Sequence, residues 1–310
     1  MQSQMNKGSL IYDDYKKLIK NKNIISQNNF NNQIQPSSLD LTLSEEGYEV
    51  KASFLSANGK VRERLKKIFI KKINLEKEYI FKKNITYIIK LNEELNLSDK
   101  IFGRCNPKSS TGRLDIFCRT ILDYSDEYEK IPFNYNGEIF LEITSRSFNI
   151  LLKKGDSLNQ MRLVSKNNEY IKDSLLKNFT NRNPIIFDHN GKNCKASVSS
   201  GLKIGVDLSK KNSISAFQAK KKTPILDFSK LRKHKVSDFW IPIKTKNGSL
   251  TINPGNFYIL KSKQKIRIPA NMAGEMIPYD TGIGDFRVHY AGFFDPGFGD
   301  PGGSYAVLEI

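Results

Sequence analysis

The segment NPKSSTGRLD, residues 106–115, brings hydroxyl and cationic side chains together at close spacing. Lys108, Ser109, Ser110 and Arg113 offer N–H and O–H donors, and the arginine fork matches phosphate oxygens in pairs. The spacing is not that of the nucleotide-binding P-loop G-x-x-x-x-G-K-[ST], because the lysine precedes the only glycine. Serine and threonine are also favoured where a helix begins. The segment therefore predicts either a phosphate site or a turn that caps a helix.

Two glutamates occupy matching apolar segments, Glu142 in IFLEI and Glu309 in AVLEI. Flanking leucine and isoleucine would desolvate each carboxylate and raise its pKa towards a range in which it both takes and returns a proton. Because side chains alternate between the two faces of a strand, spacing alone favours an outward-facing residue in water. A general acid/base and a solvated strand residue are therefore the two interpretations.

A third segment, HYAGFFDPGFGDPGG, combines a turn with glycines that would let a ligand lie against bare backbone. Asp295 in this segment either accepts a sugar hydroxyl or serves only the turn. The three histidines stand far apart with different neighbours, so a metal cluster is not indicated. The zinc deaminase signature, H-x-E with P-C-x-x-C, is absent, which excludes that class of nucleobase chemistry.

The composition favours a globular protein that binds an acidic small molecule. The chain has 310 residues, 38% of them hydrophobic, and a net charge of +18. Its lysines are spread among asparagine and isoleucine rather than gathered in a stripe, so a nucleotide is a better expected ligand than nucleic acid. The three cysteines form no C-x-x-C pair, which favours a reducing cytoplasm.

The amino-terminal region predicts neither a signal peptide nor a membrane segment. No apolar run approaches the ~20 residues that a membrane span needs, and the start of the chain has no apolar core of a signal sequence. The stretch IYDDYKKLI has apolar residues at helical spacing, with acids before lysines. We expect a short amphipathic helix there, and no membrane partner.

The chain resembles itself in three ordered blocks, which predicts a tandem duplication. TYIIKLNEELNLSDKIFGRCNP (Thr86 to Pro107) aligns without a gap with FYILKSKQKIRIPANMAGEMIP (Phe257 to Pro278). SLDLTL similarly resembles GVDLSK, and GEIFLEI resembles SYAVLEI. The first copy carries the Ser-Ser-x-x-Arg pattern, whereas the second reads PYDTGIGDF at that place.

Each copy reads as short β segments separated by Gly, Pro, Asn and Asp turns, with little helical periodicity. The sequence therefore predicts an all-β fold of sandwich or distorted-barrel type. We expect a first domain over residues 1–165, a polar linker with some local structure over 166–200, and a second domain over 201–310. The first glutamate strand is followed by TSRSFNILLKKGDSLNQMRLV, and the second has no such continuation, so the second domain is expected to be incomplete or completed differently.

Taken together, the blocks IQPSSLDLTL, NPKSSTGRLD, YNGEIFLEI, KKGDSLNQMRL, DFWIPI, PGNFYIL and GDFRVHYAGFFDPGFG resemble the superfamily of dCTP deaminases and trimeric dUTPases. The resemblance is to its tandem, two-domain bacterial deaminase branch and covers nearly the whole chain. It implies two dUTPase-like (β-clip) domains, a homotrimer and active sites shared between subunits.

The resemblance also implies site residues. The family's phosphate motif falls on Ser109, Ser110 and Arg113, with Lys108 at the preceding basic position, and its deaminase glutamate falls on Glu142 and Glu309. The cytosine-binding loop that ends in Asp-Pro-Gly matches Ala291, Asp295 and Gly297 in the second copy. In the first copy, Thr120 and Asp123 stand at the corresponding places, followed by extra residues.

The implied reaction is hydrolytic deamination of dCTP to dUTP and ammonia. A glutamate, a serine hydroxyl and a backbone carbonyl hold the water; the glutamate removes a proton, hydroxide attacks C4 of cytosine, and the same carboxyl protonates N3. The resemblance implies Mg²⁺ with the triphosphate and no zinc.

The two copies have complementary defects, because the first keeps the phosphate motif and the second keeps the Asp-Pro-Gly loop. This favours a composite site that joins Ser109, Ser110 and Arg113 to Ala291, Asp295 and Glu309, with a site built only from first domains and Glu142 as the rival. The alternatives in function are a dUTP or dCTP pyrophosphatase, in which Asp123 or Asp295 activates water, a bifunctional enzyme, and a catalytically silent nucleotide-binding protein.

Overall fold

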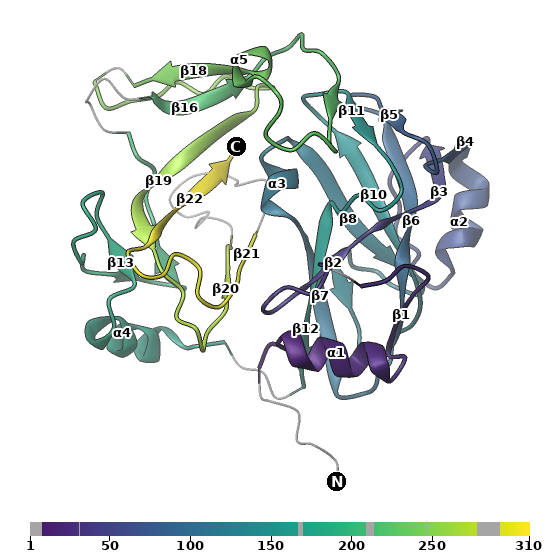
Figure 1. Cartoon of the computed structure of the whole chain (residues 1–310), viewed down its shortest axis with the longest axis horizontal. Coiled ribbons are helices and arrows are strands. Elements are labelled where there is room, and N and C mark those ends of the chain that lie inside the picture. The colour runs from purple at the N-terminus through teal and green to yellow at the C-terminus, as the bar shows by residue number, and fades with distance from the viewer. Residues whose placement is uncertain (1–7, 31, 167–169, 209–213, 246, 278–291) are drawn as a thin grey trace. The chain divides into compact units, whose positions relative to one another are not determined.

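The computed structural model describes residues 8–30, 32–166, 170–208, 214–245, 247–277 and 292–310 (Figure 1). The chain forms two compact units. Unit 1 comprises residues 1–168 and 223–234, and unit 2 comprises 169–222 and 235–310. Both units consist mainly of antiparallel strands with a few short helices, as the turn-rich, strand-like sequence predicts.

Unit 1 is built around a large sheet of order β4-β3-β6-β10-β8, to which β1 adds beside β6. Its strands are β1 (Ile24–Ser26), β3 (Leu43–Val50), β4 (Phe69–Asn74), β6 (Thr86–Asn96), β8 (Ile116–Leu122) and β10 (Asn136–Ser145). A second sheet has the order β2-β12-β7-β9, with β2 (Leu39–Leu41), β7 (Ile101–Pro107), β9 (Lys130–Ile131) and β12 (Asn159–Ser165). The helices of this unit are α1 (Tyr12–Lys20), α2 (Val61–Ile68) and α3 (Ser109–Gly112).

The third sheet of unit 1 takes one strand from the second half of the sequence. It has the order β17-β11-β5, with β5 (Tyr79–Phe81), β11 (Ile150–Leu152) and β17 (Leu226–Asp227). β17 pairs with β11 in parallel, and Leu226 is buried there. The chain therefore leaves unit 2 after residue 222, adds a strand to unit 1, and returns at residue 235.

Unit 2 contains a five-stranded sheet of order β13-β19-β16-β18, with β22 beside β19. Its strands are β13 (Ile186–Phe187), β16 (Ile214–Ala219), β18 (Trp240–Lys244), β19 (Tyr258–Ile266) and β22 (Ser304–Glu309). Two two-stranded sheets, the helix α4 (Asp173–Arg182) and the helix α5 (Val236–Phe239) complete the described part. The small sheets are β14 (Ser197–Val198) with β15 (Leu202–Lys203), and β20 (Gly274–Glu275) with β21 (Phe293–Phe294).

The strand register supports the duplication predicted from the sequence. Glu142 in β10 lies opposite Ile88 in β6, and Glu309 in β22 lies opposite Ile259 in β19. Ile88 and Ile259 are the residues that the sequence alignment of the two halves superposes. The same antiparallel pair, in the same register, therefore carries the glutamate in both units.

The segment expected to act as a linker, residues 166–200, has its own ordered elements. It contains α4, β13 and β14 in its described part. Ile185 and Ile186 pack in a buried cluster with Ile266 and Ala306 of unit 2. The clustering of contacts places residues 169–200 in unit 2, because these two isoleucines bury against its strands in spite of the polar, Asn-rich surroundings.

The sequence predicts a short amphipathic helix near the amino terminus, no membrane segment and a scattered distribution of lysines. The predicted amphipathic helix is confirmed as α1, whose Tyr15 and Leu18 are buried while Asp13 and Asp14 lie in the first turn. In the described chain, no helix is both long enough and apolar enough to cross a membrane.

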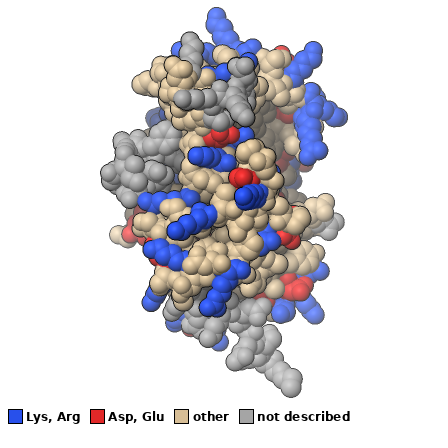
Figure 2. Space-filling view, turned by 90° about the vertical axis from the view of Figure 1, so that its left-hand side faces the viewer, with Lys and Arg blue, Asp and Glu red and all other residues tan. Residues whose placement is uncertain are grey.

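Figure 2 shows Lys and Arg side chains scattered over the visible face among uncharged residues, with a few Asp and Glu between them.

Candidate functional site

The Ser-Ser-x-x-Arg segment forms a single helical turn, α3, between β7 and β8. Ser109, Ser110 and Arg113 are exposed, whereas Thr111 and Gly112 are buried beneath them. The buried pair anchors the turn, so that the two hydroxyls and the guanidinium face solvent. The segment is therefore itself a helical turn, whose exposed side chains include donors of the kind that an anion needs, and the phosphate site stays a prediction.

Lys108 has a partner that sequence reasoning did not identify. Its Nζ atom forms an ion pair with Oδ2 of Asp40, which is 6% exposed, and Gln35 donates to the same oxygen at 3.4 Å. Arg113, in contrast, makes no ion pair with any described residue. The free cation of the motif is therefore the arginine, and the lysine is held on the neighbouring sheet.

The two glutamates are buried rather than solvated. Glu142 is 1% exposed and Glu309 is 3% exposed. The outward-facing position that spacing alone favoured is therefore wrong for both. In unit 1 the reason is a second layer, since Val61 and Leu65 of α2 pack over the sheet face that Glu142 shares with Phe140 and Ile88.

Glu142 has a charged partner on the next strand. Arg119 in β8 lies directly opposite Glu142, and its Nε atom donates to Glu142 Oε1 at 3.0 Å. The guanidinium also stacks on Tyr128, with 3.5 Å between its central carbon and the ring centroid, and approaches Phe117 at 4.9 Å. The second oxygen, Oε2, is buried and accepts no hydrogen bond from the described residues.

The proposed base-reading residues have different surroundings in the two units. In unit 1, Asp123 Oδ1 accepts a hydrogen bond at 2.8 Å from the backbone N–H of Val61, the first residue of α2, so its carboxylate caps that helix. In unit 2, Asp295 and Gly297 form a turn, with Gly297 at φ +82° and open space at its missing Cβ. Ala291 lies outside the described residues.

Glu129, which the sequence did not single out, is half-buried, and its carboxyl lies between Thr120 and Asn159 of unit 1. Thr120 Oγ1 donates to it at 3.0 Å and Asn159 Nδ2 at 3.1 Å. Burial nevertheless raises the pKa of Glu129 to about 7. Burial also raises the pKa of the neighbouring thiols, Cys105 and Cys118, well above the ordinary value. Near pH 7 the two thiols are therefore neutral, and Glu129 is partly protonated.

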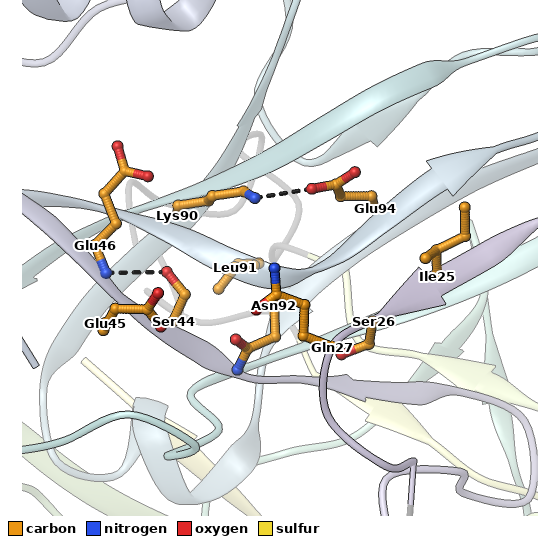
Figure 3. A pocket seen from close by; sticks show the side chains of 10 residues that line it. All are labelled: Ile25, Ser26, Gln27, Ser44, Glu45, Glu46, Lys90, Leu91, Asn92 and Glu94. Atoms are coloured by element: carbon orange, nitrogen blue, oxygen red, sulfur yellow. Dashed lines mark hydrogen bonds and ion pairs between the residues drawn. The ribbon is translucent and has the colours of Figure 1, made fainter. Parts of the chain in front are cut away.

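A polar pocket of about 390 Å³ lies elsewhere in unit 1, where a bulge separates β3 from β6 (Figure 3). Its acidic residues already have cationic partners. Lys90 contacts Glu94 at 2.8 Å and Glu138 at 3.2 Å, and Arg62 binds Glu46. None of the residues expected from the sequence lines it, and its three glutamates and one lysine do not suit a triphosphate. We therefore do not assign the substrate to this pocket.

The described side chains also bear on metal binding. Among them, no group of three or more His, Cys, Asp or Glu could hold a metal ion. These side chains therefore offer no dedicated cage for Mg²⁺.

Sequence reasoning missed four residues of this region, which are Arg119, Tyr128, Asp40 and Glu129. Each acquires its role from a partner that is distant in the chain or on another strand, such as Glu142 for Arg119 and Asn159 for Glu129. Only the register of β8 against β10 reveals the Arg119–Glu142 pair.

Arg119→Met is expected to destabilise the protein more than Glu142→Gln. The first change leaves a charge unpaired at a side chain that is 1% exposed, which costs about 3–5 kcal/mol, whereas the second leaves a cation that is 25% exposed and hydrated, for about 1 kcal/mol. Urea unfolding of both variants and of the double variant measures this, with the surface pair variant Lys71→Met as control. Equal losses from the two single changes would contradict the buried-charge argument.

Glu129 is expected to make stability fall as the pH rises from about 4.5 to about 7. Its ordinary pKa is 4.5 and its pKa in the folded protein is about 7, so the folded state retains the proton over this interval and the unfolded chain does not. The change amounts to about 3 kcal/mol by pH 7.5. Unfolding free energies at pH 5 and 7.5 should differ less in Glu129→Gln than in the parent protein, and the exposed control Glu127→Gln should behave like the parent. A Glu129→Gln protein with the parental pH dependence would exclude this role.

Comparison with known proteins identifies a family for each half of the chain. The family model described as the 2'-deoxycytidine 5'-triphosphate deaminase (DCD) N-terminal domain matches residues 6–167, and the model of the DCD C-terminal domain matches residues 172–310. No curated protein matches the chain. The solved 2'-deoxycytidine 5'-triphosphate deaminase from Agrobacterium tumefaciens is similar over 97% of this chain and 88% of its own, with 34% identity and a TM-score of 0.91. The chain therefore belongs to the 2'-deoxycytidine 5'-triphosphate deaminase family.

Proposed function

We propose that the protein is a hydrolytic deaminase that converts dCTP and water to dUTP and ammonia. The observation that carries this proposal is that the two family models together match nearly the whole chain, one on each half. The similar solved structure is named as an enzyme of the same activity. The exposed hydroxyls and arginine of α3 suit the phosphate tail of this substrate.

We assign the phosphate contacts to Ser109, Ser110 and Arg113. These three residues are exposed on one helical turn, and Arg113 has no ionic partner among the described residues. Lys108 lies at the edge of this group and contributes positive charge, although Asp40 holds its ammonium group. Mg²⁺, when bound to the triphosphate, would neutralise part of its negative charge.

We assign proton transfer to Glu309. It is buried in β22, and the second copy also retains the Asp-Pro-Gly turn that the resemblance connects with the cytosine. That turn is held by Gly297, whose N–H donates to the carbonyl of Ile268, just beyond β19. In this assignment the carboxylate of Glu309 takes a proton from water, the water oxygen bonds to C4, and the proton passes to N3. The carboxylate then moves the remaining proton from the C4 hydroxyl to N4, so that the C4–N4 bond breaks, ammonia leaves and the C4 carbonyl forms. Asp295, Gly297 and Ala291 then orient the base.

The finer features that the resemblance implies are part of the same proposal. We propose that each unit is a dUTPase-like β-clip domain, that the protein assembles as a homotrimer, and that it works in the cytoplasm. The prediction that one site combines residues of the two copies stays a prediction. A pyrophosphatase that uses Asp123 is disfavoured, because that carboxylate already caps α2.

Incubation of the protein with dCTP and Mg²⁺ tests the reaction, and Glu309→Gln tests the residue. The parent protein is expected to form dUTP and ammonia, and Glu309→Gln should lower kcat/KM by about 10²- to 10⁴-fold, because it removes the general acid/base. Glu275→Gln in β20 is a control of the same chemical kind. Formation of dUMP and pyrophosphate would indicate the pyrophosphatase instead, and binding without products would indicate a silent nucleotide-binding protein.

Arg113→Gln is expected to raise KM for dCTP by about 10- to 100-fold with a smaller effect on kcat. The reason is that a charge-assisted hydrogen bond contributes about 1.5–3 kcal/mol to binding the phosphates in both ground and transition states. Arg104→Gln, an exposed arginine in the adjacent β7, should leave KM unchanged. Steady-state kinetics with dCTP measures both, and an unchanged KM in Arg113→Gln would remove the arginine from the phosphate site.

A further inference from the structure

The loop at residues 123–129 replaces the family's base-reading loop in the first copy, and it is tied down at several points. Tyr124 N–H donates to Gly59 O and Ala57 N–H donates to Ser125 O, both at 2.9 Å. The fully buried Ser56 donates through its hydroxyl to Leu122 O at 2.5 Å and accepts from Ser125 N–H at 3.0 Å. The loop is therefore fixed by backbone bonds to the segment that leads into α2.

The helix α2 adds a hydrophobic layer to the same region. Val61 and Leu65 form one buried cluster with Ile88, Ile121 and Phe140 of the large sheet, and Tyr128 of the loop packs against this cluster. Phe140 and Glu142 are two residues apart in β10, so they face the same side. The loop and α2 thus cover the sheet face that carries Glu142.

Arg119 connects the covering loop to the glutamate. Its guanidinium stacks on Tyr128 at 3.5 Å and donates to Glu142 at 3.0 Å, so one side chain binds both the loop and β10. Arginine keeps its charge throughout the accessible pH range, and a charge-assisted hydrogen bond holds it to an ionised carboxylate. A glutamate that cycles its proton would lose this partner in every turnover.

Burial alone does not separate the two glutamates, since Glu309 is buried as well, but the groups around Glu142 restrict its contact with a base. One oxygen is bound by Arg119, and the other is buried with no donor among the described residues. A proton carrier must come within hydrogen-bond reach of the group that it serves. A pyrimidine would reach Glu142 only by displacing Arg119, Tyr128 or α2, which are the groups that cover it.

The second copy differs in sequence at the position of the arginine. Thr120 aligns with Ala291, so the residue that aligns with Arg119 is Tyr290, which is uncharged. Tyr290 lies outside the described residues, and the comparison is therefore one of residue types alone. At this aligned position the first copy therefore has a cationic residue type and the second an uncharged one.

We infer that the base site of the first copy is permanently closed. Arg119 and Tyr128 occupy it, and Glu142 holds Arg119 in place. Glu142 is then a structural anion, and each chain binds one pyrimidine nucleotide rather than two. This inference rests on the proposed function, because it concerns which of two glutamate sites takes the substrate.

The number of nucleotides bound per chain tests the closed site directly. Equilibrium dialysis of the unmodified protein with dUTP and Mg²⁺ avoids turnover, since dUTP is the product of the proposed reaction. One dUTP per chain is expected at saturation. Two equivalent dUTP molecules per chain would overturn the inference, because the second would require an open site in the first copy.

The Glu142→Gln variant supplies an independent test. Its kcat/KM for dCTP is expected to stay within threefold of the parent value, with an unchanged pH profile, and Glu138→Gln in the same strand is a matched control for loss of an ion-paired carboxylate. A 100-fold loss of kcat/KM in a folded Glu142→Gln protein would make Glu142 catalytic and overturn the inference. If the unmodified protein forms no dUTP, the proposed function fails, whereas two dUTP molecules per chain in the dialysis would still show that the first site is open.

Discussion

The burial of a carboxylate in an apolar strand is the constraint on which the arrangement of this protein depends. Glu142 and Glu309 occupy the same position in equivalent strand pairs, opposite Ile88 and Ile259. A buried charge needs a cation, a set of donors or a change of protonation. In unit 1 the need is met by Arg119, and the arginine in turn requires an aromatic surface, which Tyr128 provides. This ion pair therefore acts together with the backbone hydrogen bonds of the loop to hold the loop over the sheet.

The two copies illustrate how a duplicated fold divides its tasks. The first retains the exposed Ser-Ser-x-x-Arg turn, and its loop carboxylate, Asp123, caps α2. The second retains the Asp-Pro-Gly turn and a buried glutamate but lacks the Ser-Ser-x-x-Arg motif. Once each copy has the component that the other lacks, selection on the unused component relaxes. Residues there are free to serve packing, as α2 and Arg119 do.

Much of this organisation could be predicted from the sequence, because local patterns carry it. The strand segments and the helix α1 follow from the local order of apolar and polar residues. The duplication follows from comparing the two halves of the sequence, and the donors of α3 can be read directly from it. The burial of Glu142 could not be predicted, since it depends on α2, a helix more than seventy residues away in sequence. The ion pairs Lys108–Asp40 and Arg119–Glu142 depend likewise on strand register, which the pattern of side chains alone does not determine.

The excursion of residues 223–234 has a consequence for how the two halves evolved. β17 comes from the second half of the chain but completes a sheet with β11 and β5 in unit 1. A gene split at the boundary near residue 168 would therefore yield a first half with the edge of β11 uncovered, and an uncovered edge invites pairing with other chains. The first half therefore depends on a backbone segment of the second half to cover the edge of β11, so a single cut near residue 168 would not separate two units that are each complete.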